Sequence, residues 1–293
     1  MSAPPAMPSA VTGPIDPRLL AEWSAVRKVV RDEVTASPLA RLAAWLDRDE
    51  PSPRAGDIAP PGAHMLYFLS VTRQSLLGDE GGLPREGPPI PWRRKMWLGS
   101  RMQLHEPLRV GDAIERVETI KSIVPKSARS GHLLFVTFRD EISGPRGLSV
   151  VEEFDLVYRD DTPGPDPVPP EQTRPHDAVW RETVRVDNAS LFRFSALTYN
   201  SHRIHYDHPY TTQVEKYPGL LIPGPLHQML QLDLTRRQAG PRTLKEFASR
   251  AVRPAFCPGD LSVEGCPASD TEAALWSLDA QGCVVLASTL RWA

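Results

Sequence analysis

The chain has 293 residues, with 34 basic and 36 acidic side chains, a net charge of −2, 41% hydrophobic residues and 24% charged residues. This composition is that of an ordinary globular protein with room for about two domains, and it lacks the basic excess of nucleic-acid-binding proteins. No stretch approaches 18 consecutive apolar residues, and residues 1–15 lack the basic start and apolar core of a signal peptide, so we expect no membrane span and no secretory leader.

The first predicted elements are helices. Residues 1–15 are expected to be disordered, and Asp16-Pro17 then starts a helix, because Asp is a good N-cap and Pro suits the first helical position. Apolar residues continue at helical spacing as far as residue 30: Leu19, Leu20, Trp23, Val26, Val29 and Val30. Ser37-Pro38 repeats the start signal before a second helix, and Trp23 and Trp45 are expected in the core.

Strands are predicted from about residue 95 onward. Alternating apolar residues begin near Met96, and three further segments are rich in Val, Ile, Phe and Thr: 113–124, 132–142 and 148–158. The residues from Gly144 to Gly147 are predicted to form the hairpin turn between the last two of these segments. The first half therefore ends as an antiparallel sheet.

A polar segment with six prolines, 160–175, is the predicted linker between the halves. The second half begins with a strand over 179–186, and Asp187 or Asn188 can cap a short helix. A His-rich loop precedes a predicted helix over 224–238. Four strands then complete the chain: 244–252, 261–265, 272–279 and 283–292.

The two halves share an order of elements. Gly111-Asp112 and Gly259-Asp260 each precede a strand and a long hairpin, and the two Asp residues are 148 positions apart (260 − 112). This recurrence, on either side of the linker, predicts a duplicated unit.

Cysteine content bears on cofactors and location. The chain has three cysteines, an odd number, and they form no CxxC motif: Cys257, Cys266 and Cys283. This argues against a disulfide framework or a zinc site, and favours buried reduced thiols in a cytoplasmic protein.

The densest group of chemically active side chains runs from Tyr199 to Asp207. Asn200, His202, Arg203 and His205 place an amide, imidazoles and a guanidinium within a few residues. Such a set is costly to bury in a core and unusual for a plain solvated loop. Loops of this kind tend to carry function, so this segment is the candidate site.

Residues 195–207 read Ser-Ala-Leu-Thr-Tyr-Asn-Ser-His-Arg-Ile-His-Tyr-Asp. They resemble the signature of one branch of the MaoC-like, hot-dog-fold enoyl-thioester hydratases. That branch contains the hydroxyacyl-thioester dehydratases and the mesaconyl-C4-CoA (3-methylfumaryl-CoA) hydratases. Residues 217–226, 93–97 and 155–159 resemble the same branch, so the resemblance spans roughly residues 60 to 293.

The resemblance implies an α+β double hot dog. In this fold two antiparallel sheets each wrap a central helix and pair edge to edge, here with additional N-terminal helices. The first half is usually the degenerate copy, and the second half carries the site. The expected organisation is a disordered terminus (1–15), a degenerate hot-dog half (16–159), the linker (160–175) and the half with the active site (176–293).

The resemblance also implies catalytic roles. Hydration needs activation of water at Cβ, a proton at Cα and stabilisation of an enolate oxygen; His205 can act as base and acid. Gly224 opens a predicted helix and matches the family's oxyanion donor. Asn200 replaces the Asp of the general motif, and an amide can orient water but cannot carry a proton. The second proton-transfer group is therefore open between His205 itself, Asp207 and His202.

The residues expected to bind substrate each have alternative roles. Arg203 pairs either with a substrate carboxylate or with Asp207, and Arg193 is a similar candidate. Tyr199 and His202 are candidates to line the pocket. Residues 93–95 form either a coenzyme A phosphate contact or a solvated basic turn, and His208 and His227 are expected to be structural hydrogen-bonding residues. Pro223 departs from the family, which has His before the Gly.

The expected activity is hydration of an α,β-unsaturated acyl thioester, or the reverse dehydration of a 3-hydroxyacyl thioester, with a short, branched or dicarboxylic acyl group. The chemistry needs no metal or redox cofactor, because coenzyme A or an acyl carrier is part of the substrate. We expect no nucleic-acid or membrane partner, and either a monomeric pseudo-dimer or a homodimer. The alternatives are a hot-dog thioesterase and a non-catalytic acyl-thioester-binding protein.

Overall fold

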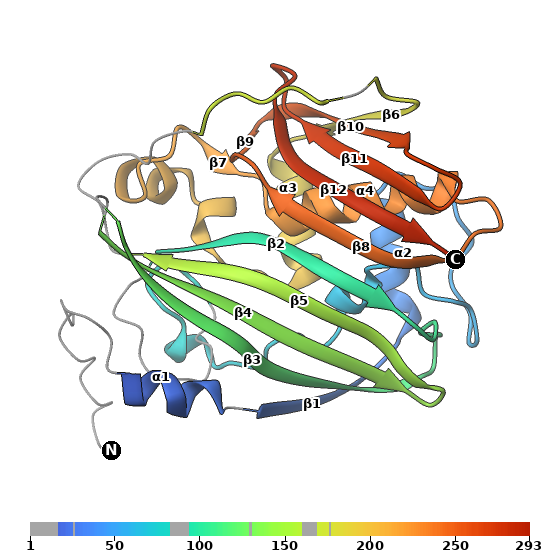
Figure 1. The fold of residues 1–293 in the computed structure, drawn as a ribbon, viewed down its shortest axis with the longest axis horizontal. Coiled ribbons are helices and arrows are strands. Elements are labelled where there is room, and N and C mark those ends of the chain that lie inside the picture. Colours follow the sequence, from blue (N-terminus) through green and yellow to red (C-terminus); the bar gives the residue numbers. More distant parts are fainter. Residues whose placement is uncertain (1–16, 26, 83–93, 129–130, 160–168, 176) are drawn as a thin grey trace.

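The computed structural model describes residues 17–25, 27–82, 94–128, 131–159, 169–175 and 177–293. The main sheet is antiparallel and has the order β1-β3-β4-β5-β2-β8-β12-β11-β10-β6. In Figure 1 the green strands of the first half run into the orange and red strands of the second. The first-half strands are β1 (Arg27–Glu33), β2 (Arg94–Leu104), β3 (Ala113–Ala128), β4 (Gly131–Gly144) and β5 (Gly147–Arg159). The second-half strands are β6 (Trp180–Val186), β8 (Leu244–Ala251), β10 (Gly259–Pro267), β11 (Glu272–Leu278) and β12 (Val284–Trp292).

The strand order confirms the predicted double hot dog. Counted outward from the centre, the halves read β2-β5-β4-β3-β1 and β8-β12-β11-β10-β6, so each element has a counterpart in the same place. The halves join where β2 pairs with β8, from Gly99 opposite Arg250 to Gln103 opposite Glu246. Gly99 is required at this seam, because a Cβ there would lie 2.1 Å from the carbonyl oxygen of Ser249.

The long helix α4 (Gly224–Gln238) lies against the second half of the sheet, with the bounds that the sequence predicted. It is buried around most of its circumference, because its apolar side chains, such as Leu226 and Met229, alternate with polar ones that also have partners. Gln228 accepts hydrogen bonds from Ser100 and Ser249, both at 2.8 Å. Satisfied polar groups of this kind fix the helix in one position under the seam.

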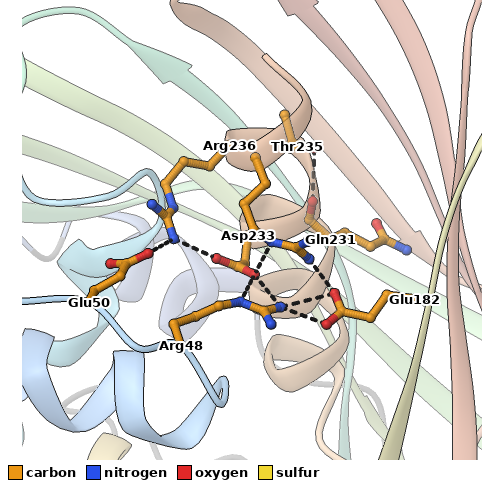
Figure 2. A network of polar contacts seen from close by, with 8 residues as sticks. Arg48, Glu50, Glu182, Gln231, Asp233, Thr235 and Arg236 are labelled. Atoms are coloured by element: carbon orange, nitrogen blue, oxygen red, sulfur yellow. Dashed lines mark hydrogen bonds and ion pairs between the residues drawn. The ribbon is translucent and has the colours of Figure 1, made fainter. Parts of the chain in front are cut away.

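An ion network around the buried Asp233 holds the far end of α4 to both halves (Figure 2). Asp233 accepts from Arg48, which follows helix α2 (Ala36–Trp45), at 2.8 Å, and from Arg236 at 2.9 Å. Arg48 also bonds both oxygens of Glu182 on β6. Burial raises the pKa of Asp233, but the hydrogen bonds from Arg48 and Arg236 outweigh it and hold the pKa below its ordinary value. The carboxylate is therefore ionised at neutral pH.

The remaining elements are short. They are α1 (Pro17–Ser24), η1 (Ala63–Leu66), η2 (Gln74–Leu76), α3 (Asn188–Thr198), η3 (Arg203–His205), η4 (Tyr210–Val214), β7 (Leu220–Leu221) and β9 (Phe256–Cys257). Helices α2 and α3 pack together through the rings of Trp45 and Phe194, whose centroids are 5.1 Å apart. Trp23 is buried against Phe138 and Tyr158. Both tryptophans therefore contribute to apolar packing, as predicted.

Two predictions need correction. The first helix does not extend to residue 30: it ends at Ser24, and Arg27–Glu33 form β1, paired with β3. Helical spacing of Val29 and Val30 was misleading, because β-branched residues fit a strand that has a partner. In the first half, the described residues between β1 and β2 form α2 and two short turns, so a long central helix is present in the second half alone. Residues 1–16 and 160–168 lie outside the described residues, and with them the predicted disordered terminus and most of the linker.

Candidate active site

His205 is held in one tautomer by a backbone carbonyl. The side chain is 8% exposed, and its Nδ1 lies 2.9 Å from the carbonyl oxygen of Leu221. A carbonyl oxygen can only accept, so Nδ1 carries the hydrogen and Nε2 keeps its lone pair. Burial lowers the pKa of His205 to about 4. The imidazole is therefore neutral at physiological pH and has a basic nitrogen available.

The residue that orients His205 is close in sequence to the start of α4. Leu221 lies on β7, which pairs with β9 through Phe256. Three residues later, Gly224 begins α4, where the first N–H groups have no intrahelical acceptor. Within the described part of the chain, the Gly224 N–H donates to no other residue. One short segment thus supplies both the carbonyl that fixes the imidazole and an N–H at the positive end of the helix dipole.

The first half covers this helix start. A Cβ at Gly224 would lie 2.3 Å from Cε3 of Trp97, which belongs to β2. Only glycine permits the indole to approach the backbone this closely. Trp97 is therefore a first-half residue that shapes the surroundings of the candidate oxyanion donor, and the sequence motif alone did not identify it.

The loop before His205 is fixed by its own polar side chains. Helix α3 begins with the predicted Asp187 cap and ends at Tyr199, whose φ of 51° is left-handed. The Asn200 side-chain oxygen accepts from the N–H of His202 at 3.1 Å. Asp207 accepts from the Arg203 guanidinium at 2.7 Å and 2.9 Å, and from the N–H of Tyr210 at 3.0 Å. The hydrogen bond from the Tyr210 N–H and that from Arg203 hold the pKa of Asp207 below its ordinary value, against burial.

Of the two partners considered for Arg203, the structure shows Asp207. The Arg203 guanidinium also donates to the carbonyl of Asp79 at 3.0 Å and lies 4.1 Å from the ring centroid of Tyr210. Both oxygens of Asp207 are engaged within the loop, which favours a positioning role over proton transfer. Each of these two charges is paired with the other within the loop.

A first-half segment clamps the same loop from the other side. The Arg203 N–H donates to the carbonyl of Glu80 at 2.8 Å, and the Ser201 hydroxyl donates to the carbonyl of Gly81 at 2.6 Å. A Cβ at Gly81 would lie 2.1 Å from the Ser201 carbonyl oxygen, so glycine is needed for this approach. This contact could not be predicted from residue spacing, because a Gly-Gly pair in a polar loop is typical of an ordinary turn.

The other predicted site residues fall into two groups. His202 stays near His205: their rings are edge to face, with centroids 5.6 Å apart. Burial, followed by the charges of His205 and Lys95, lowers the pKa of His202 to about 3. Tyr199 is 58% exposed, and Arg193 lies on the exposed side of α3, so these two are not gathered with His205 in the structure.

Two buried polar atoms near the ends of the site's helices are unsatisfied. They are the hydroxyl of Ser195 on α3 and Nδ1 of His227 on α4, neither of which has a hydrogen-bond partner among the described residues. Such groups in a folded protein call for a water or a ligand. His227 was expected to be a structural hydrogen-bonding residue, and its Nδ1 does not act as one here. His208 uses its carbonyl to accept from Thr212.

A double hot dog with a neutral, buried imidazole beside the start of its central helix is the arrangement of a hot-dog hydratase or dehydratase. Residues 62–257 match the hydroxyacyl-thioester dehydratase type 2 family, Htd2. The chain therefore belongs to this family, and the resemblance found in its sequence is confirmed.

Individual relatives agree with this membership. The chain is 41% identical over 237 residues to the mesaconyl-C(4)-CoA hydratase of Chloroflexus aurantiacus, covering 80% of this chain and 84% of that protein. It is 27% identical over 262 residues to the mitochondrial hydroxyacyl-thioester dehydratase type 2 of Schizosaccharomyces pombe, covering 78% and 86%. The crystal structure of HtdX from Mycobacterium tuberculosis has a TM-score of 0.65 at 15% identity, covers 92% of this chain and 100% of that one, and supports the fold alone.

Two other kinds of site are absent from the described residues. No helix there is both long and apolar enough to span a bilayer, and no cluster of three or more His, Cys, Asp or Glu could hold a metal ion. Cys257, Cys266 and Cys283 are free thiols, and Cys257 and Cys283 are buried.

Proposed function

We propose that this chain adds water across the Cα=Cβ bond of a short α,β-unsaturated acyl-CoA thioester, or catalyses the reverse dehydration. The observation that carries the proposal is the hydrogen bond from His205 Nδ1 to the Leu221 carbonyl, three residues before the start of α4, which leaves Nε2 as a neutral base. The hydratase and dehydratase named among the relatives support the same reaction class. The dicarboxylic substrate in the name of the Chloroflexus protein makes a short dicarboxylic acyl group the first choice.

The mechanism uses one base twice. His205 Nε2 removes a proton from water as the water oxygen bonds to Cβ, and the C=C electrons move toward the thioester carbonyl. The Gly224 N–H donates to the enolate oxygen that develops, where the helix dipole also favours negative charge. The protonated Nε2 then delivers its proton to Cα as the enolate collapses. One water is added, and His205 returns to its neutral form.

The loop residues act in support. Arg203 and Asp207 hold the loop through their ion pair, and are positioning residues in this mechanism. Asn200 uses its side-chain oxygen within the loop, which leaves its NH₂ group to orient the attacking water. His202 packs on the His205 ring. Tyr199 and Arg193 are exposed, so they take no part in the proton transfers proposed here.

The proposal is tested by incubating the purified chain with crotonyl-type and mesaconyl-type thioesters of coenzyme A. Loss of the conjugated C=C absorbance, with a product heavier by one water, is the expected result. Release of free thiol would identify a thioesterase instead, and binding without turnover would identify a non-catalytic protein. Repeating the assay with acyl-carrier-protein thioesters separates the two carriers.

The domain bounds, the absence of a metal or redox cofactor, the cytoplasmic location and the choice between a monomeric pseudo-dimer and a homodimer stay predictions. A size measurement in solution decides the last of these directly.

A further inference from the structure

The first turn of α4 offers a ligand very few backbone donors. Pro225 has no N–H group, and the N–H groups of Leu226 and His227 both donate to the carbonyl oxygen of Pro223, at 3.0 and 3.4 Å. Within the described part of the chain, this leaves Gly224 as the residue of the turn whose N–H has no acceptor. Sites that stabilise an enolate oxygen commonly combine backbone and side-chain donors, histidine among them. A second donor at this helix start therefore has to be a side chain.

His227 differs from the other buried polar side chains of α4. Four of the five have hydrogen-bond partners: Gln228, Gln231, Asp233 and Thr235. His227 is 4% exposed, and its Nδ1 has no hydrogen-bond partner among the described residues. A buried polar atom without a partner costs free energy, which a ligand that supplies the partner recovers.

Helix geometry directs the His227 side chain toward the start of α4. Residues three apart are neighbours on one face of a helix, so His227 lies on the same face as Gly224. Helical side chains also lean toward the N-terminus and cover the preceding turn, which here is the turn that contains Gly224. Leu221, whose carbonyl oxygen accepts from His205, lies three residues before Gly224. The unpartnered imidazole therefore belongs to the end of α4 at which the proposed chemistry takes place.

The charge state of His227 suits a hydrogen-bond donor. Burial lowers the pKa of His227 to about 4, so the imidazole is neutral at physiological pH. A neutral imidazole has one N–H and one lone pair, and a hydrogen on Nδ1 makes the unpartnered atom a donor. Such a donor stabilises a developing negative charge without adding a buried cation to the site.

We propose that the Nδ1–H of His227 is a second oxyanion donor, which acts with the Gly224 N–H on the thioester carbonyl oxygen as this becomes an enolate oxygen. This inference rests on the proposed hydratase function and adds a catalytic residue to it. The contribution is a hydrogen bond alone: the hydrogen stays on Nδ1, and both proton transfers remain with His205.

The test compares His227→Leu with His227→Asn on whichever of crotonyl-CoA and mesaconyl-CoA the wild type hydrates faster. Leucine removes the donor, whereas the side-chain nitrogen of asparagine is attached to Cγ, as Nδ1 of histidine is, and keeps a donor there. We expect kcat to fall about 10²–10³-fold in His227→Leu, the usual cost of one oxyanion donor, and at least about 10-fold of this loss to be recovered in His227→Asn.

Thr235→Val is the matched control, because it removes a buried hydroxyl that donates within the same helix, farther from Gly224. Its kcat should equal that of the wild type. Urea unfolding midpoints identify a misfolded variant, and His227→Met replaces His227→Leu if the latter does not fold.

Binding of butyryl-CoA separates catalysis from the shape of the pocket. This saturated thioester has no C=C bond to hydrate, so its dissociation constant measures ground-state binding. A donor that acts mainly on the enolate oxygen contributes more to the transition state than to this complex. The dissociation constant in His227→Leu should therefore stay close to that of the wild type while kcat falls.

Three outcomes would overturn the inference. Folded His227→Leu keeps the kcat of the wild type; His227→Leu and His227→Asn lose kcat equally; or butyryl-CoA binding weakens as much as kcat falls, which would make His227 a packing residue. If the wild type hydrates neither substrate, the proposed hydratase function fails and the second donor fails with it. If the wild type hydrates one of them and kcat does not respond to His227→Leu, the second donor alone fails.

Discussion

Gly224→Ala tests how the two halves meet at the proposed oxyanion donor. The added Cβ would lie 2.3, 2.6 and 3.2 Å from three carbon atoms of the Trp97 ring. Ordinary carbon contacts are near 3.5 Å, so the ring or the helix start has to move by about 1 Å. Alanine would otherwise favour a helix over glycine. Any loss of stability therefore arises from the clash.

The expected cost of this overpacking is about 1–3 kcal/mol of unfolding free energy. Activity should fall further, because a displacement of about 1 Å at a reacting group can cost on the order of 100-fold in rate. Urea unfolding and kcat on the best thioester measure the two effects separately. Gly144→Ala is the matched control, because its Cβ would have nothing nearer than 3.7 Å.

Trp97→Leu in the Gly224→Ala background should recover part of both losses, since the shorter side chain makes room. The two substitutions are therefore expected to be non-additive in a double-mutant cycle. If Gly224→Ala keeps the stability and kcat of the wild type, or if the two substitutions are strictly additive, then Trp97 of β2 does not constrain the start of α4.

Three further predictions follow from buried charge. Asp233→Asn should cost about 1.5–3 kcal/mol of unfolding free energy at pH 7, because the buried Asp233 carboxylate accepts charge-assisted hydrogen bonds from three partly buried arginines. Glu246→Gln, in an exposed ion pair, should hardly matter; equal effects of the two substitutions would argue against the network. Burial lowers the pKa of His227 to about 4, so the free energy of unfolding should decline as the pH falls from about 6.5 toward 4. In urea titrations, His227→Gln should remove about 2 kcal/mol of the stability that the wild type loses between pH 7 and pH 5. Because the pKa of His205 is also lowered to about 4, kcat/KM should stay flat down to about pH 5 and fall below it; a decline centred near 6.5 would contradict a buried neutral base.

Much of this architecture was predictable because its signals are local. The Gly224 start of α4, the Asp187 cap and the Gly144–Gly147 turn are each determined by a few neighbouring residues. Strand β1 was not predictable in this way. Its valines fit either period, and pairing with β3 decided the outcome.

The site was predictable as a segment, but not in its contacts. The motif identified His205, yet the carbonyl that fixes its tautomer belongs to Leu221, sixteen residues away. The spacing suited Arg203 equally to a substrate carboxylate and to Asp207, and in the structure Arg203 is paired with Asp207. Arg94 lies opposite Arg159 because β2 pairs with β5, although these strands are far apart in sequence. Contacts of this kind are set by topology, which residue spacing does not encode.

The central claim is that a neutral His205 carries both proton transfers. His205→Gln tests it most directly, because glutamine can still donate to the Leu221 carbonyl but cannot accept a proton from water. With mesaconyl-CoA or crotonyl-CoA as substrate, and product identified by the added mass of one water, we expect kcat to fall about 10²–10⁴-fold with little change in the unfolding midpoint. Near-wild-type turnover in a folded His205→Gln protein would contradict the account.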